Sequence, residues 1–266
     1  MPPGYERGMT MLDYNHNGGE FASAINHLID VALEDENHQQ TPRTYLGASR
    51  LGVACERALQ FEYAHAPKDT GKDFDGQLLR IFAAGHLFED MAIRWLRMAG
   101  FELFTTKGNR PNGEQFGFEA AGGRIQGHVD GIIVSGPNSI TMGYPCLWEC
   151  KSLNNKSWND TVKRGLALSK PVYAAQVAIY QAYMEPQVGG ISANPALFTA
   201  INKDTSEIHH ELVPFDAPLA QKMSDRAVRI IKATEAHELL PRISRESTHF
   251  QCRMCSWADR CWSLSA

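Results

Sequence analysis

The chain has 266 residues, a length that suits one large domain or one core with extensions. Apolar residues make up 43% and charged residues 21%, as in an ordinary soluble globular protein, and no apolar run is long enough to span a bilayer. Residues 1–7 lack the apolar stretch of a secretory signal, so we expect a cytoplasmic protein with no membrane partner. The net charge of −4 disfavours a broad basic surface for nucleic acid, and leaves that role to a local basic patch or to metal ions that offset carboxylates.

The first 45 residues are polar and turn-rich at their ends, and apolar residues between those ends predict a short amphipathic helix. A second helix is expected over about 50–64, with Ser49 as its cap and Cys55 inside it. A longer helix is predicted over about 76–99, ending at Gly100, and residues 101–121 predict a strand and a turn.

Residues 123–134 and 146–152 predict two strands joined by a turn at 135–139. Further along the chain we expect helices at 157–169, 171–185 and 217–238, paired strands at 196–201 and 208–213 joined by a turn at 202–205, and a cysteine-rich tail.

An acidic pair lies on the two predicted strands. Asp130 is on the first strand and Glu149 on the second, and a hairpin pairing would bring them side by side. Because side chains alternate along a strand, Lys151 points the same way as Glu149 while Cys150 points the opposite way. Two adjacent carboxylates repel each other, and a Mg²⁺ or Mn²⁺ ion with oxygen ligands would relieve that repulsion. Such an ion can activate water for phosphodiester hydrolysis, and Lys151 could orient the water or stabilise developing negative charge.

The motif around these residues resembles the PD-(D/E)XK nuclease signature. Asp130 lies in Gly-His-Val-Asp-Gly, 18 residues separate it from Glu149, and Glu149-Cys150-Lys151 follows, with Val129 in place of the proline. Gln176-Val-Ala-Ile-Tyr180 resembles the Q-x-x-x-Y motif of the RecB-like branch, and His86 falls where that branch carries a metal-ligating histidine.

The resemblance implies a restriction-endonuclease-like α/β core with a central mixed sheet flanked by helices. That core would be a single domain over 46–266, with 1–45 as an extension. It implies metal ligation by His86, Asp130, Glu149 and the backbone carbonyl of Cys150, and catalysis by Lys151 together with Asp130, Glu149, Gln176 and Tyr180.

Physical chemistry supports these residues independently. Gln176 and Tyr180 are four apart and share a helix face, and histidine suits Mn²⁺ better than Mg²⁺. Plainer interpretations exist as well, since a helix histidine is often structural, and glutamine and tyrosine are ordinary residues of an amphipathic helix. The matching order of the four motifs favours the functional interpretation.

Four of the six cysteines form a candidate ligand set. Cys252 and Cys255 are spaced to bind one metal, Cys261 follows after five residues, and Cys55 can supply a fourth thiolate from far upstream. Zinc and iron–sulfur clusters both accept four thiolates, so the spacing leaves both open. Cys146 and Cys150 fit buried apolar positions better.

This cysteine layout resembles iron–sulfur RecB-like exonucleases, including the CRISPR-associated spacer-processing family and the AddB nuclease domain, over about residues 45–262. Ser256 departs from the proline that often follows the second cysteine. The resemblance implies a structural 4Fe-4S cluster that clamps a helical region to the core and a DNA exonuclease acting on single strands or DNA ends. It also implies a phage-encoded protein with a protein partner in recombination or CRISPR adaptation. A structural Zn²⁺ site is the alternative for the cysteines, and a catalytically silent DNA-binding partner of the same fold is the alternative for the whole chain.

DNA contacts are expected from a basic stripe on the helix at 217–238. It comprises Lys222, Arg226, Arg229 and Lys232, which recur at helical spacing and would neutralise phosphates. Trp158 could stack on a base of single-stranded DNA. A solvated helix face and a core tryptophan are the plainer interpretations.

Overall fold

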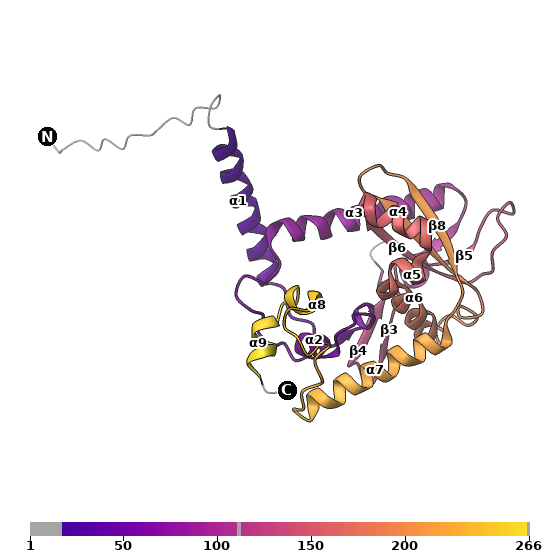
Figure 1. Cartoon of the computed structure of the whole chain (residues 1–266). Coiled ribbons are helices and arrows are strands. Elements are labelled where there is room, and N and C mark those ends of the chain that lie inside the picture. The colour runs from indigo at the N-terminus through magenta and orange to yellow at the C-terminus, as the bar shows by residue number, and fades with distance from the viewer. Residues whose placement is uncertain (1–17, 111–112, 265–266) are drawn as a thin grey trace. The chain divides into compact units, whose positions relative to one another are not determined.

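The computed structural model describes residues 18–110 and 113–264 (Figure 1). The chain divides into two compact units. One comprises Met1–Thr41 with Phe74–Ala83, and the other comprises Pro42–Asp73 with Ala84–Ala266. No helix in the described part of the chain is long and apolar enough to cross a membrane.

The smaller unit contains α1 (Gly18–His38) and the first turns of α3 (Gly76–Met98). Arg80 pairs with Asp30, and the backbone N–H of Gly76 donates to Glu34 Oε1 at 2.9 Å. A Cβ atom at Gly76 would overlap the backbone of Asp30, so glycine permits this close approach. At 21 residues, α1 is longer than the short helix expected from the sequence.

The larger unit is built on a five-stranded sheet with the order β2-β5-β6-β7-β8. Strand β6 pairs parallel with β7, and every other pairing in this sheet is antiparallel. The expected α/β core with a central mixed sheet is therefore confirmed. The strands are β2 (Glu102–Phe104), β5 (Gly131–Ser135), β6 (Cys146–Leu153), β7 (Ala196–Asn202) and β8 (Ile208–Val213).

Strand β6 of this sheet is buried on both faces, because helices pack against each side of it. Leu147 and Leu153 belong to the core formed with α6 (Pro171–Met184) and α7 (Ala217–Glu235). Cys146, Trp148 and Cys150 belong to a second core with Ala92 and Leu96 of α3. Glu149 and Lys151 share the face of Leu147 and Leu153, as strand alternation predicts.

The single strand predicted over 123–134 is in fact two strands in two sheets. β4 (Ile125–His128) lies between β1 (Leu46–Gly47) and β3 (Gly117–Ala120) in a three-stranded sheet, whereas β5 belongs to the large sheet. Gly127 and Gly131 flank the crossing, and a Cβ at either would collide with packed side chains. The chain thus leaves one sheet and enters the other at Val129-Asp130.

Helix boundaries also differ from the sequence prediction in two places. Cys55 precedes α2 (Glu56–Tyr63) as its N-cap and does not lie within the helix. The helix predicted over 157–169 is divided by Gly165, at a φ of 75°. The two pieces are α4 (Asn155–Arg164) and α5 (Leu166–Ser169), and the remaining short elements are α8 (Phe250–Arg253), α9 (Ala258–Ser263) and 3-10 turns at Ala48–Arg50 and Lys107–Asn109.

Candidate active site

Asp130 and Glu149 come together through the pairing of β5 with β6. The register aligns Gly131 with Trp148, which sets the preceding Asp130 opposite the following Glu149. The backbone N–H of Cys150 donates to Asp130 Oδ2 at 2.8 Å and fixes that carboxylate. The predicted juxtaposition of the two carboxyl groups is therefore present in the fold.

Lys151 joins this pair from the same strand. Its Nζ is hydrogen-bonded to Glu149 Oε1, lies 3.7 Å from Asp130 Oδ2, and donates to the Cys150 carbonyl at 3.1 Å. The Tyr173 ring lies 5.6 Å from the same Nζ, within the range of a cation–π contact. The Lys151 side chain is 23% exposed and that of Asp130 12%, whereas the Glu149 side chain is fully buried.

Helix α6 supplies two further residues. Gln176 is buried, and its Nε2 donates to Glu149 Oε1 at 2.6 Å. Tyr180 lies one turn later, is also buried, and has Ser49 beside its hydroxyl. Tyr173 precedes Gln176 by three residues and shares its helix face, so helical periodicity could have identified this residue, which the sequence analysis missed.

The electrostatics of the site follow from burial and like charge. Burial, followed by the charge of Asp130, raises the pKa of Glu149 to about 8. Burial and then the charge of Glu149 raise the pKa of the Tyr180 hydroxyl. Burial opposes the charged form of Lys151, but Asp130 and Glu149 outweigh it and raise the lysine pKa well above its ordinary value. The lysine therefore stays protonated at neutral pH, and binding of a divalent metal ion would favour the ionised form of Glu149.

Helix α3 brings Glu89, and not His86, toward this group. The His86 side chain is 82% exposed, and its Nδ1 lies 4.0 Å from Glu89 Oε2. Glu89 is mostly buried, and its pKa is raised to about 7 by burial and then by the charge of Asp130. The sequence analysis missed Glu89, although its position three residues after His86 was the available signal.

The donor set is compatible with a cation but is not a preformed ligand cage. Among residues 18–110 and 113–264, no three His, Cys, Asp or Glu side chains are placed to hold one metal ion together. Glu149 Oε2, however, is buried and has no hydrogen-bond partner. A buried carboxylate oxygen without a partner is costly, and a bound cation would satisfy it.

The four predicted ligand cysteines line one cavity of about 300 Å³. Burial raises the pKa values of Cys252 and Cys255, and the thiols of Cys55 and Cys261 add to the shift in both. Four thiolates around one zinc ion would each lie about 2.3 Å from it, and no such tight group occurs in the described part of the chain. Cys146 and Cys150 lie in the sheet core, where apolar burial was expected.

The cysteine-bearing tail docks on the segment that follows α2. Trp257 Nε1 donates to the Ala66 carbonyl at 2.8 Å. The Asp69 carboxylate accepts from the backbone N–H groups of Asp259 and Arg260 at the start of α9, at 2.7 and 3.1 Å. These bonds bring Cys55 and the three tail cysteines to the same cavity from opposite ends of the larger unit.

Comparisons with known proteins reach the fold level at most. The sequence matches no protein-family model and no curated protein sequence. Among solved structures, an alkaline exonuclease (LHK-Exo) from Laribacter hongkongensis is 14% identical with a TM-score of 0.49, over 74% of this chain and 90% of that one. The same exonuclease in complex with dAMP is 15% identical with a TM-score of 0.46, over 73% and 89%. The protein SSO0001 is 15% identical with a TM-score of 0.45, over 91% and 98%. Likeness at this level does not bear on activity.

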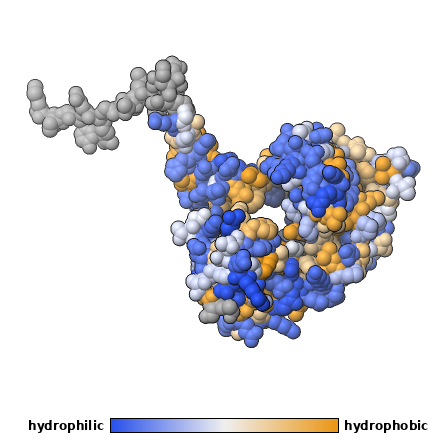
Figure 2. Space-filling view, in the orientation of Figure 1, coloured by the Kyte–Doolittle hydropathy of each residue, from blue (hydrophilic) through white to orange (hydrophobic). Residues whose placement is uncertain are grey.

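The basic stripe on α7 is partly engaged within the protein. Arg226 and Arg229 both pair with Glu56, and Arg226 Nη1 also donates to the carbonyls of Leu51 and Val53 at 2.7 and 2.9 Å. Lys222 and Lys232 are exposed, on a helix whose visible side is mainly hydrophilic (Figure 2). A DNA-binding role for the stripe stays a prediction, and its two lysines are the members left available for it.

Trp158 is half-buried and packs against the main core. Its Nε1 donates to the Ala200 carbonyl at 3.1 Å, so the indole is oriented by the sheet. Base stacking by Trp158 stays a prediction that this placement does not favour.

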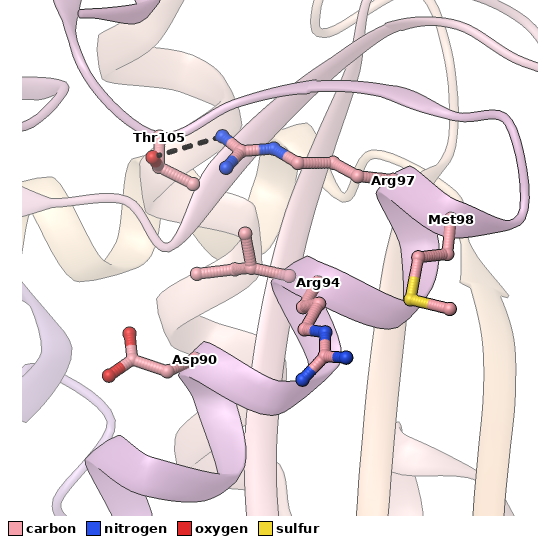
Figure 3. Close-up of a pocket in the computed structure, with 6 residues that line it drawn as sticks. Asp90, Arg94, Arg97, Met98 and Thr105 are labelled. Atoms are coloured by element: carbon pink, nitrogen blue, oxygen red, sulfur yellow. Dashed lines mark hydrogen bonds between the residues drawn. The ribbon is translucent and has the colours of Figure 1, made fainter. Parts of the chain in front are cut away.

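A pocket of about 560 Å³ lies along the second half of α3 and contains none of the acidic-site residues (Figure 3). Arg97 donates to the Leu103 carbonyl at 2.9 Å and to Thr105 Oγ1 at 3.4 Å, so its guanidinium is hydrogen-bonded within the protein. The pocket is lined by Asp90, Ile93, Arg94, Arg97, Met98 and Thr105.

Proposed function

We propose that the chain is a divalent-metal-dependent deoxyribonuclease of the PD-(D/E)XK type that removes nucleotides from DNA ends. One observation carries the proposal: Asp130, Glu149, Lys151 and Gln176 converge, and Glu149 Oε2 is left buried without a partner. A structural pair would be expected to satisfy both carboxylate oxygens, whereas a cation site needs one free.

Asp130, Glu149 and the Cys150 carbonyl would hold Mg²⁺ or Mn²⁺, with Glu89 or His86 as a further ligand. A divalent ion bound there supplies water activation and charge neutralisation at the scissile phosphate. Displacement of the proton from Glu149 would accompany binding, because ligand carboxylates must be ionised.

The remaining residues of the site position Glu149 and Lys151 and stabilise negative charge on the phosphate. Lys151 keeps its proton at neutral pH, which favours electrostatic stabilisation of the phosphate over a role as general base. Gln176 fixes one oxygen of Glu149 and so directs the other toward the cation. Tyr180 and Tyr173 enclose the site from the same helix, and Tyr173 also restrains the lysine.

End-labelled linear DNA, single- and double-stranded, and circular DNA test the proposal with Mn²⁺ or Mg²⁺ present. We expect degradation of linear DNA, and a loss of about 10²–10³-fold in rate for Lys151→Ala with DNA binding kept. The exposed Lys156 of α4 provides the matched control, Lys156→Ala. A Lys151→Ala protein as active as wild type would overturn the proposal. Binding without cleavage by the wild type would favour the silent DNA-binding partner.

We further propose a structural 4Fe-4S cluster on Cys55, Cys252, Cys255 and Cys261. Because the four cysteines line one cavity, a single metal group could bind all of them, and the resemblance of their spacing to iron–sulfur exonucleases favours the cluster over zinc. Iron and acid-labile sulfide in the purified protein, with broad absorption near about 400 nm, would support the cluster. A colourless protein with stoichiometric zinc would establish the alternative.

A further inference from the structure

Arg57, in the first turn of α2, is a buried cation with no acidic partner among residues 18–110 and 113–264. Its residue is 2% exposed. Within the described part of the chain, its Nε donates to the Leu240 carbonyl, and its Nη1 lies 3.9 Å from Cys261 Sγ. No carboxylate pairs with it, unlike Arg226 and Arg229, which share Glu56.

A buried guanidinium without a counter-charge is unfavourable. Arginine keeps its proton in proteins, so it cannot escape the cost of burial by becoming neutral. The Leu240 carbonyl accepts one hydrogen bond but carries no charge, and burial of an ion is costly unless it is paired. The group within reach that can carry a negative charge is the Cys261 sulfur.

The cysteine cavity next to Arg57, in turn, would lack positive charge. Its four cysteines would bind a metal group as thiolates, and four thiolates carry more negative charge than one divalent ion offsets. Arg242 lies on the same cavity, but its Nη2 is bonded to the carbonyls of Cys261 and Leu264 and its guanidinium stacks on Trp262. Arg57 is the guanidinium that points at a ligand sulfur.

We propose that Arg57 is the buried counter-charge of the cysteine site and a positioning residue for Cys261, through an N–H···S bond that holds the metal group in place. The inference rests on the cofactor part of the proposed function. Net charge and hydrogen bonds to the sulfurs are among the factors that set the reduction potential of such clusters, so Arg57 would also tune that potential.

A purely structural role would make Arg57 an anchor for the segment 238–240. Gln60, one turn later on the same helix, already anchors that segment: its Nε2 donates to the Glu238 carbonyl at 2.5 Å and its Oε1 accepts from the Leu240 N–H at 2.9 Å. Gln60 is also buried, but its hydrogen bonds go to Glu238 and Leu240, whereas Arg57 also reaches the sulfur of Cys261. Gln60→Met is therefore a matched control for the anchoring role.

The test compares full-length wild type, Arg57→Gln, Arg57→Met, Arg57→Lys and Gln60→Met, all purified without oxygen. Metal release to an excess of chelator is followed at a pH at which the protein is folded, and circular dichroism checks the folding. We expect Arg57→Gln and Arg57→Met to lose metal about tenfold faster than wild type, and Gln60→Met to stay within about twofold. If the metal is iron, the two neutral variants should also have more negative midpoint potentials, because loss of a nearby positive charge disfavours the reduced cluster.

Folded neutral variants with wild-type release and potential would overturn the assignment of Arg57 and leave the cluster proposal intact. If the neutral variants do not fold, Arg57→Lys provides the test, because it keeps the positive charge and loses the forked geometry of the guanidinium. Retention of the metal by Arg57→Lys supports the counter-charge role. Loss of the metal from a correctly folded Arg57→Lys protein overturns that role. A wild-type protein that binds neither iron nor zinc would overturn the cluster proposal itself and, with it, the role of Arg57.

Discussion

Glu149 is a carboxyl group that is buried beside a second acid, Asp130. Its pKa is raised from 4.5 to about 8, so between these values the folded protein holds a proton that the unfolded chain has released. The free energy of unfolding of the metal-free protein should therefore fall as pH rises through this window, by about 1.4 kcal/mol per pH unit for each such proton.

Glu149→Gln should flatten this pH dependence and make the metal-free protein more stable than wild type at the upper end of the window. Glu89, whose pKa is raised to about 7, would leave a smaller slope below that value. Urea denaturation in the presence of EDTA at several pH values measures the effect, with the exposed Glu119→Gln as control. Equal slopes in wild type and Glu149→Gln would contradict the buried-carboxyl account.

Glu89 and His86 compete for the role of the further metal ligand, and their orientations favour Glu89. Glu89→Gln should raise the Mn²⁺ concentration for half-maximal DNA cleavage by about tenfold, and by more than His86→Ala does. Asp90→Asn, which changes the exposed carboxylate next to Glu89 in the chain, serves as the control. A larger effect of His86→Ala would show that the histidine turns toward the cation when it binds.

At the scale of elements, α7 holds the chain ahead of α2. Arg226 binds Glu56 and the carbonyls of Leu51 and Val53, which fixes the loop that presents Cys55. A stripe that looks like a phosphate-binding surface in sequence is thus divided between a structural arginine pair and two exposed lysines.

Arg226→Ala should destabilise the protein by about 1–3 kcal/mol, because it leaves buried acceptors unpaired. The salt dependence of DNA binding should stay unchanged in that variant. Lys222→Ala and Lys232→Ala should leave the stability within about 0.5 kcal/mol of wild type. Each should lower the slope of log binding constant against log salt concentration by about one. Thermal unfolding and DNA titrations over a range of salt concentrations separate the two cases. A reduced salt slope in Arg226→Ala would restore that arginine as a DNA contact.

At the scale of the whole molecule, the cysteine cavity joins the chain before the five-stranded sheet to the chain after it. A metal group there would contribute its binding energy to folding, since the unfolded chain has no assembled site. Cys55→Ser should lose the metal and lower the melting temperature by on the order of 10 °C, equivalent to about 3–5 kcal/mol at this size. It should also make the tail after residue 241 more sensitive to protease.

Cys146→Ala is the control for that experiment, because Cys146 is buried in the sheet core away from the cavity. It should keep its metal and its protected tail. A Cys55→Ser protein that retains both the metal and the wild-type melting temperature would show that Cys55 is not a ligand.

Local patterns in the sequence were sufficient for the strands β6, β7 and β8 and for the acidic pair. A short connection between two paired strands brings Asp130 opposite Glu149, and side-chain alternation along β6 puts Lys151 on the same face as Glu149. Helical spacing gives Gln176 and Tyr180 a common face. These relations depend on neighbours a few residues apart or on one hairpin, so periodicity alone specifies them. The α/β class with a mixed sheet came from the resemblance to the nuclease motifs, since periodicity does not specify that β6 pairs parallel with β7.

Only the tertiary structure decided which side chains meet across long separations. It split the predicted strand at Val129-Asp130, directed Glu89 instead of His86 toward the carboxylates, paired Arg226 with Glu56, and set Arg57 against Cys261. Each depends on the packing of elements far apart in the chain, and on rotamers that local sequence does not fix. For the same reason the sequence could propose four cysteine ligands, but only the fold could bring them to one cavity.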